Sequence, residues 1–404
     1  MGKSSNVIVR RRRVFYIPGY DPIHPRRYRE LYRTEGAEQA NISGYEIDLA
    51  AKKPGSGPYG WHVSGRIEGG ETETNVEVLV WSDIVRDSMS NTIQATYVQL
   101  ARTAWTYIGS GALWRLMKLR KGPVIAALYP VLFLIGQLAL ALLMAWGLGQ
   151  AIALFLPWWV GFAGLAVVPP VLMWFRKMDG KFFAYYLMHD YAYSAASKGE
   201  NPPELEARMS EFGARIAAAL KEDVDEVLVV GHSSGAHLAV SILSDVIRAG
   251  LVPEDGPALS FLSLGQVVPM VSFLPRAFRL RADLAYLSAR TELTWVDVTA
   301  PGDGCSFALC DPVSVSGVAP EDKRWPLVVS AAFTQTLSPE RWQELRWRFF
   351  RLHFQYLCAF DRPGDYDYFR ITAGPKTLAA RYEGRSPSKS RIEGAVNKFP
   401  QIAP

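Results

Sequence analysis

Between residues 201 and 246 the spacing of apolar residues changes from helical to strand-like and back. After the cap-like segment Asn201–Glu204 a helix is predicted, because apolar side chains recur every three or four positions, at Leu205, Met209, Phe212, Ile216 and Leu220. The run 226–230 predicts a buried strand, and helical spacing resumes over 236–246. The predicted order around residue 231 is therefore helix, strand, turn and helix.

Two shorter apolar runs also predict strands. Residues 14–17 end at Pro18–Asp21, a segment typical of a tight loop. Residues 293–298 lead into Pro301–Gly304, which has the composition of another loop. With 404 residues, the chain is long enough for one large domain with an insertion, or for two ordinary domains.

The longest apolar segment lies between Lys121 and Arg176, where no Asp, Glu, Lys, Arg or His occurs. It contains two stretches of bilayer-spanning length, 123–146 and 151–175, separated by a predicted turn at 147–150. We expect a transmembrane hairpin. Two other interpretations stay open: a re-entrant hairpin that enters one leaflet, and a helical pair buried in a soluble core.

The net charge of +5 and the pI near 9.0 owe much to basic residues beside this segment, namely Arg115, Lys118, Arg120, Lys121, Arg176, Lys177 and Lys181. A further run, Arg10–Arg13, precedes the first predicted strand. This placement favours an anionic membrane surface over nucleic acid, for which no recognition motif occurs. By the positive-inside rule we expect an integral protein of the plasma (inner) membrane with both termini in the cytoplasm.

The strand at 226–230 continues into Gly231-His232-Ser233-Ser234-Gly235, a G-x-S-x-G pattern followed by a helix. On such a sharp turn the serine hydroxyl is held exposed, and the glycines let neighbouring backbone approach. The helix also directs its amino terminus at the place where a tetrahedral intermediate would carry negative charge. The five-residue pattern occurs often by chance, so its flanking strand and helix are what indicate Ser233 as a nucleophile.

A serine hydroxyl becomes a good nucleophile only when a base removes its proton. Five of the six histidines lie before the motif, within it or on the helix directly behind it: His24, His62, His189, His232 and His237. His353 alone lies late in the chain, as the order serine, acid, histidine requires. We therefore expect His353 to be the base.

The base needs a carboxylate that fixes its orientation, and two aspartates are candidates. Asp303 lies at the tip of the loop that follows the strand at 293–298, which makes it the favoured acid. Asp311 remains the alternative, because a longer loop could bring it under His353. Either residue could instead be an ordinary turn-forming aspartate.

An oxyanion hole requires two backbone N–H groups near the nucleophile. The first is expected from Ser234, which directly follows Ser233. The second is expected from Tyr20, in the loop after the early strand, where Gly19 lets the backbone turn.

These residues resemble those of the α/β-hydrolase superfamily, and Gly231–Gly235 is similar to the G-H-S-x-G elbow of lipases and esterases. The resemblance covers about residues 10–86 and 201–375, and it includes 262–266, which is similar to the strand after the elbow in lipases. It implies a mainly parallel sheet flanked by helices, a Ser/acid/His triad and ester hydrolysis through an acyl-enzyme. In one respect the chain departs from the family, since its large insertion precedes the elbow.

No metal or other cofactor is expected, because this chemistry needs none and no metal-ligand cluster or phosphate loop occurs. The three cysteines, Cys305, Cys310 and Cys358, lack the paired close spacing of a zinc or redox motif. Their odd number also argues against a disulfide scaffold.

We expect one domain of α/β-hydrolase type interrupted by a membrane-spanning helical hairpin. Residues 1–86 would carry the oxyanion loop, 87–200 the insertion and 201–380 the triad. The end, 381–404, is rich in Ser, Gly, Lys, Arg and Pro and is expected to be disordered.

The expected function is that of a membrane-anchored serine hydrolase, lipase-like or esterase-like, cleaving a lipid-like acyl ester at the bilayer. Two alternatives remain: an acyltransferase that uses the same triad, and a catalytically inactive membrane scaffold of hydrolase fold. The sequence indicates no particular protein partner.

Overall fold

The computed structural model describes residues 8–52, 58–89 and 92–404, so residues 1–7 of the expected N-terminal part lie outside the described residues. In the described residues, eight strands form one sheet in the order β2-β3-β4-β1-β5-β6-β7-β8. The strands are β1 (Arg11–Ile17), β2 (Glu46–Ala51), β3 (Gly60–Ile67), β4 (Gly70–Val78), β5 (Glu226–His232), β6 (Ala258–Leu264), β7 (Leu293–Thr299) and β8 (Leu327–Ser330).

The sheet is mainly parallel. Strands β4, β1, β5, β6, β7 and β8 pair in parallel, whereas β2 and β3 join the edge through antiparallel pairs. The α/β class and the mainly parallel sheet expected from the sequence are confirmed. The strand predicted at 226–230 is β5, and the one predicted at 293–298 is β7.

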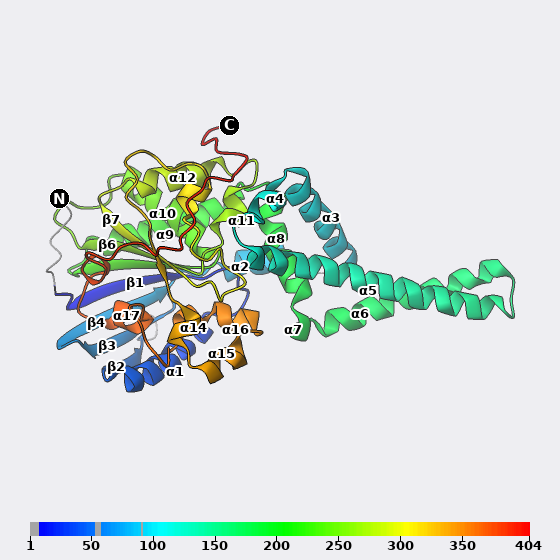
Figure 1. Cartoon of the computed structure of the whole chain (residues 1–404), viewed down its shortest axis with the longest axis horizontal. Helices are drawn as coiled ribbons and strands as arrows, with labels where there is room; N and C mark the ends of the chain where they lie inside the picture. The colour runs from blue at the N-terminus through cyan, green and yellow to red at the C-terminus, as the bar shows by residue number, and fades with distance from the viewer. Residues whose placement is uncertain (1–7, 53–57, 90–91) are drawn as a thin grey trace.

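Helices cover both faces of this sheet (Figure 1). The helices before residue 121 are α1 (Arg26–Ser43), α2 (Ser82–Ser88), α3 (Ile93–Gly109) and α4 (Ala112–Leu116). The rest of the insertion comprises α5 (Lys121–Ala153), the 3-10 helix η1 (Trp158–Val167), α6 (Val168–Lys177), α7 (Asp179–Phe182) and α8 (Ala184–Ala196).

The remaining helices follow the insertion. They are α9 (Pro203–Ala219), α10 (Gly235–Arg248), α11 (Val268–Ser272), α12 (Phe278–Ser288), α13 (Pro312–Val315), α14 (Phe333–Thr336), α15 (Pro339–Leu345), α16 (Phe349–His353), the 3-10 helix η2 (Gln355–Leu357), α17 (Tyr368–Ala373) and α18 (Leu378–Arg381). The helix predicted over 205–220 is confirmed as α9, and the one over 236–246 as α10.

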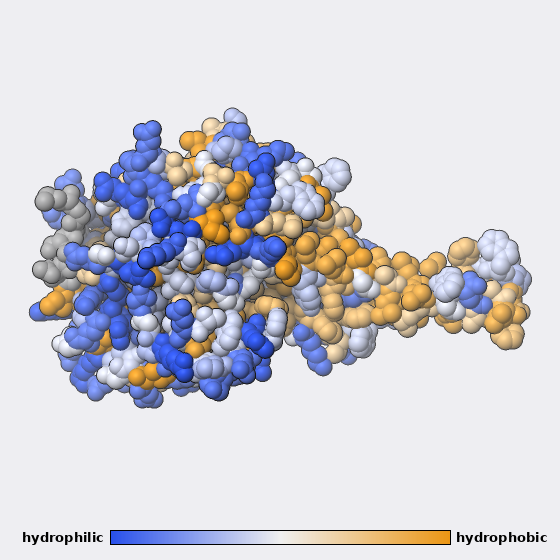
Figure 2. All heavy atoms as spheres, in the orientation of Figure 1, coloured by the Kyte–Doolittle hydropathy of each residue, from blue (hydrophilic) through white to orange (hydrophobic). Residues whose placement is uncertain are grey.

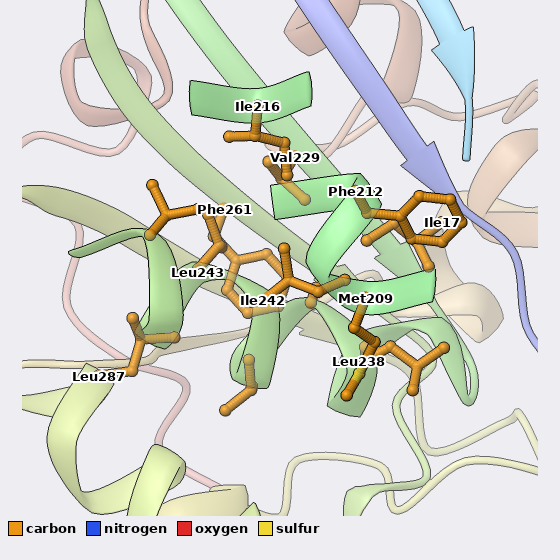
Figure 3. Close-up of a cluster of buried hydrophobic side chains, with 14 of the residues drawn as sticks. Ile17, Met209, Phe212, Ile216, Val229, Leu238, Ile242, Leu243, Phe261 and Leu287 are labelled. Atoms are coloured by element: carbon orange, nitrogen blue, oxygen red, sulfur yellow. The ribbon is translucent and has the colours of Figure 1, made fainter. Parts of the chain in front are cut away.

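The apolar residues that predicted α9 and α10 form the core on one face of the sheet. Figure 3 shows Met209, Phe212 and Ile216 of α9 meeting Leu238 and Ile242 of α10 over the central strands. A second core fills the opposite face, beneath α1 and α17. Burial on both faces explains why the central residues of β5, Val227–Val230, are all apolar.

The basic run at the start of the chain leads into the sheet, since Arg11–Arg13 begin β1. Arg10 and Arg11 are exposed, but Arg12 is buried, so the interpretation of the run as a membrane-facing cluster is wrong for Arg12. Arg12 is 1% exposed, and its Nε lies 2.7 Å from Glu226 Oε2 on the neighbouring strand β5. Arg13 pairs with Glu77 and Glu222. The carboxylate partners of Arg12 and Arg13 come from β5, from β4 and from the segment just before β5. Sequence alone does not reveal such partners.

The central part of the insertion projects from the rest of the molecule as a long arm made of α5, η1 and α6 (Figure 1). Its surface is largely hydrophobic, in contrast to the hydrophilic surface of the body (Figure 2). Exposed apolar side chains include Leu143, Phe155 and Trp158. Two helices of the arm, Lys121–Ala153 and Trp158–Lys177, are long and apolar enough to cross a membrane, by length and composition.

The turn of the arm lies further along the chain than predicted. Residues 147–150 remain helical inside α5, and the chain reverses between Ala153 and Trp158, at Pro157. The glycines serve helix packing instead: a β-carbon added to Gly149 would lie 2.6 Å from Gly161 O, and one on Gly164 would lie 2.3 Å from Ala145 O. Small residues therefore let the two segments of the arm approach closely.

The C-terminal segment is packed, which corrects the expectation of disorder over 381–404. Asp311 N donates to Ile392 O at 2.9 Å, and Asn397 Nδ2 donates to Ser272 O at 3.1 Å. Arg281 Nε donates to Gln401 O. The polar composition of the segment, which suggested a solvated tail, provides hydrogen bonds to the body of the protein.

Replacing Gly164 with Leu should separate η1 from α5, because overpacking of this kind costs about 1–3 kcal/mol. Gly147→Leu is the matched control, since nothing lies within 4 Å of a β-carbon at that position. We expect Gly164→Leu to lower the midpoint of thermal unfolding in detergent by a few degrees, with Gly147→Leu close to the native protein. Equal midpoints for both variants would contradict the packing described.

Candidate active site

Ser233 lies on the turn between β5 and α10 with φ of 56°, in the left-handed region that non-glycine residues rarely adopt. This conformation costs about 1–2 kcal/mol and persists only where surrounding contacts fix it. Ser233 N donates to Leu264 O at 2.9 Å, and Ala236 N donates to Ser233 O at 3.1 Å. The strained serine is therefore held between β6 and the first turn of α10.

Three glycines let the backbone close around this turn. A β-carbon on Gly19 would lie 2.9 Å from Ser233 Cβ, and one on Gly235 would lie 2.1 Å from Ile17 O. A β-carbon on Gly231 would lie 2.8 Å from Ala236 Cα. The loop after β1 thus contacts the serine directly through Gly19, and both glycines of the G-x-S-x-G pattern are required by close contacts.

His353 and Asp303 form a buried pair next to the turn. His353 ends α16, and Asp303 lies in the loop after β7. The imidazole Nδ1 is 2.7 Å from Asp303 Oδ2, and the two residues are 6% and 2% exposed. Tyr356 donates its hydroxyl to the same Oδ2 at 3.0 Å, and Cys305 N donates to Oδ1 at 2.9 Å. The carboxylate is therefore fixed by several donors.

These donors decide the charge of Asp303. Burial by itself raises the pKa of the Asp303 carboxyl, but the charge and hydrogen bond of His353 oppose burial, with help from the donors of Cys305 and Ser306. Together they leave the pKa below its usual value. Asp303 is therefore a carboxylate near neutral pH, and His353 Nδ1 donates to it, which leaves Nε2 as the free nitrogen of the ring.

Asp311, the alternative acid, has a different place in the fold. Its side chain caps α13 by accepting from Val313 N and Ser314 N, each at 3.0 Å. Its other oxygen lies 2.7 Å from Lys323 Nζ. Of the two candidate acids, Asp303 is the one that the structure places against His353.

Ser233 and His353 border the same short segment, Leu264–Gly265. Ser233 N donates to Leu264 O, and a β-carbon on Gly265 would lie 3.1 Å from His353 Cε1. In the described part of the chain no hydrogen bond joins the Ser233 hydroxyl to His353. Such bonds are often long in ligand-free sites and shorten when substrate is bound.

His232 supports the backbone of His353. Its Nε2 donates to His353 O at 3.0 Å, and the two rings lie 4.9 Å apart. Burial, followed by the neighbouring charge of His353, lowers the pKa of His232 to about 3. His232 is therefore neutral and positions the backbone of His353.

The expected oxyanion donors both have free N–H groups. Across the described residues, neither Tyr20 N nor Ser234 N donates a backbone hydrogen bond. The loop that holds Tyr20 is braced on two sides, since Trp81 Nε1 donates to Pro18 O at 2.9 Å and the Tyr186 hydroxyl donates to Tyr20 O. Two donors next to Ser233 are thus available for an oxyanion.

The inserted segment contributes a carboxyl that sequence reasoning missed. Asp190 lies on α8, on the helix face that also carries Tyr186 and Tyr193, both of which contact Tyr20. Burial raises the pKa of Asp190 to about 7, and the charge of His353 partly opposes that rise. The helical spacing of residues 186, 190 and 193 indicates that their side chains share one face of a helix. Nothing in the sequence indicates which part of the protein this face covers.

Asp303, Cys305 and His353 also form a group whose potential metal-ligating atoms lie within 4.8 Å of one another. Burial, followed by the negative charges of Asp303 and Asp190, raises the pKa of the Cys305 thiol well above its usual value. A protonated thiol is a poor metal ligand, since metals bind the thiolate. The expectation that the site uses no metal stays a prediction.

No family model matches the chain. No curated protein and no solved structure matches it either. The resemblance to α/β-hydrolases therefore depends on the residues and on the geometry around Ser233, and the activity that it implies is a proposal.

Asp190→Asn should change the pH dependence of stability. A raised carboxyl pKa means that the folded state holds a proton that the unfolded state releases, so stability falls as pH rises from about 4 to about 7. Asparagine removes this loss. We expect the melting temperature of Asp190→Asn, relative to native protein, to increase between pH 5 and pH 8 in scanning fluorimetry, and a constant difference would contradict the assignment.

Proposed function

We propose that the protein is a membrane-anchored serine hydrolase that cleaves a carboxylic ester, with Ser233, His353 and Asp303 as its triad. The observation that carries the proposal is a serine held in a left-handed conformation between a strand and a helix, beside a buried His–Asp pair. A residue in that conformation persists because its surroundings fix it, and such strain is typical of functional sites. The fold would then be that of an α/β-hydrolase.

In the proposed reaction, the Ser233 Oγ attacks the ester carbonyl carbon while His353 Nε2 accepts the hydroxyl proton. The carbonyl oxygen becomes an oxyanion that Tyr20 N and Ser234 N stabilise. The C–O bond to the alcohol then breaks, and the alcohol leaves with the proton from His353. Water attacks the acyl-enzyme in the same way, which releases the carboxylic acid and restores Ser233.

Anchoring to a membrane is supported by the exposed apolar arm. Charged residues are absent between Lys121 and Arg176, and the arm's surface is hydrophobic on the face seen in Figure 2. Exposing so large an apolar surface to water costs free energy, whereas a bilayer would bury it. We propose that the arm enters the bilayer from the cytoplasmic side and that the substrate is a lipid-like acyl ester.

The insertion also contacts both loops of the site, which favours catalysis over a purely scaffolding role. The base of α5 meets the acid loop, since Arg120 Nε donates to Ala308 O at 2.8 Å and Gly122 packs against Gly304. On the other side Tyr186 of α8 contacts Tyr20 O. A scaffold has no need for an anchor joined to these two loops.

Asp303→Asn should lower kcat for ester hydrolysis by about 10⁴-fold if Asp303 orients and stabilises the imidazole. Asp311→Asn is the matched control. Asparagine retains the oxygen that caps α13, and Asp311 contacts Lys323 instead of His353. Hydrolysis of a p-nitrophenyl ester by detergent-solubilised protein measures both. Losses of similar size in the two variants would contradict the proposed acid.

The fate of the acyl group separates a hydrolase from an acyltransferase. We expect ¹⁸O from labelled water to appear in the released carboxylic acid, with that product dominant even when a small alcohol such as glycerol is present. Mass spectrometry of the products gives the ratio of acid to new ester. Predominant transfer to the alcohol would replace hydrolysis by acyl transfer as the function.

The anchor can be tested by charging the exposed face of the arm, at Leu140, Leu142 and Leu143. Each lysine at the centre of a bilayer costs roughly 2.5–3.5 kcal/mol, so the triple lysine variant should move from the membrane pellet to the supernatant in alkaline carbonate. Leu251→Lys, on an exposed part of the body, should leave the protein in the pellet. Release of the native protein by carbonate would contradict the anchor.

A further inference from the structure

An apolar pocket of about 60 Å³ lies where the insertion meets the sheet domain. Its walls come from α3, α4, α5 and α8, with Met270 of α11 as a further contact. The lining is almost wholly apolar, and the Tyr107 hydroxyl at its edge is already engaged, donating to Met270 O at 2.9 Å. Such a pocket accepts methylene groups and rejects a charged or hydrated group.

One wall of the pocket borders the loop that carries Asp303. Tyr191 of α8 lines the pocket. Tyr191 packs against an apolar cluster that includes Phe307, in the loop that carries Asp303. Gly122, two residues before Val124 of the lining, packs against Gly304 of the same loop. Cys305 in turn belongs to the group whose polar atoms lie within 4.8 Å of Asp303 and His353. The pocket therefore adjoins the loop that carries Asp303 and Cys305.

The opposite wall belongs to the base of the arm. Val124, Ala127, Leu128 and Val131 occupy the first turns of α5, the helix that continues into the exposed apolar arm. Ile108 of α3, also in the lining, is 49% exposed, so apolar surface extends from the pocket to the outside. The pocket thus lies between the part of the molecule proposed to enter a bilayer and the side chains around Ser233.

We propose that this pocket binds one acyl chain of a lipid that enters from the bilayer along the base of α5, with its ester carbonyl at Ser233. This inference rests on the proposed function and narrows its substrate class to esters with a long acyl chain. At about 60 Å³ the pocket holds only part of a long chain, and the rest of the chain would lie along the exposed apolar surface that continues toward the arm. Short soluble esters would use the triad without this pocket and so react less efficiently.

Ala104→Phe tests the pocket by filling it from α3. Ala104 lines the pocket, whereas Ala101, one turn earlier on the same helix, is exposed and outside the lining, so Ala101→Phe is the matched control. The measured quantity is the ratio of kcat/KM for a C16 p-nitrophenyl ester to that for the C4 ester in mixed micelles. A ratio also cancels any change in the amount of folded enzyme.

We expect Ala104→Phe to lower the C16/C4 ratio by about tenfold or more, and Ala101→Phe to leave it within twofold. Ala127→Phe should act like Ala104→Phe from the opposite wall, which keeps the test valid if one variant fails to fold. An unchanged ratio in both pocket variants would overturn the pocket while leaving the hydrolase standing. Absence of any ester turnover by native protein would instead remove the proposed function itself.

A second measurement does not depend on turnover and tests the bilayer as the source of the chain. Vesicles containing phosphatidylcholine with a diazirine at the end of one acyl chain are irradiated with Ser233→Ala protein inserted in them. We expect cross-linked peptides from the lining, at 103–116 and 187–191, and competition by unlabelled long-chain ester. Cross-links confined to 138–175, the outer part of the arm, would contradict the proposal.

Discussion

The close approach of three backbone segments around Ser233 is the constraint on which the site depends. Gly19 allows the loop after β1 to touch the serine, and Gly235 allows α10 to begin against the end of β1. These contacts hold only if β1 and β5 are parallel neighbours that end at the same edge of the sheet, as they do. Strand β7 ends at that edge too, which brings the loop of Asp303 to the same place.

Burial and hydrogen bonds fix the protonation states of the side chains around Ser233. Asp303 is fully enclosed, and the donors that surround it keep it ionised, while the buried imidazole of His232 stays neutral. The charge arrangement therefore directs the proton of His353 toward Asp303 and frees the opposite nitrogen. Asp190, brought in by α8, adds a second carboxyl whose protonation changes near pH 7. The insertion is thus part of the electrostatic environment of the site and also supplies the proposed membrane anchor.

The sequence predicted those elements that local pattern determines. Apolar spacing located α9, β5, α10 and β7, and the G-x-S-x-G pattern located the turn of Ser233. Chain order selected His353 and left two acids open. The choice of Asp303 over Asp311 needed tertiary structure, because one aspartate meets the imidazole and the other caps a helix.

Other features could not be predicted because they depend on distant partners. The arginines of β1 looked like a surface cluster until Glu226 and Glu77 were placed beside them. Residues 147–150 looked like a turn because glycines break isolated helices, yet they lie inside α5, where Gly149 lets the two segments of the arm pack closely. The C-terminal segment looked solvated by composition, although its polar groups bond to the body. The role of α8 at the site also depends on a loop more than 160 residues earlier.

The most direct test of the account is to treat the intact protein with a fluorophosphonate and map the modified residue by peptide mass spectrometry. The account predicts one stoichiometric adduct on Ser233, absent in His353→Ala protein that remains folded by circular dichroism. An adduct on another residue, or none on folded native protein, would contradict the assignment of Ser233 as an activated nucleophile.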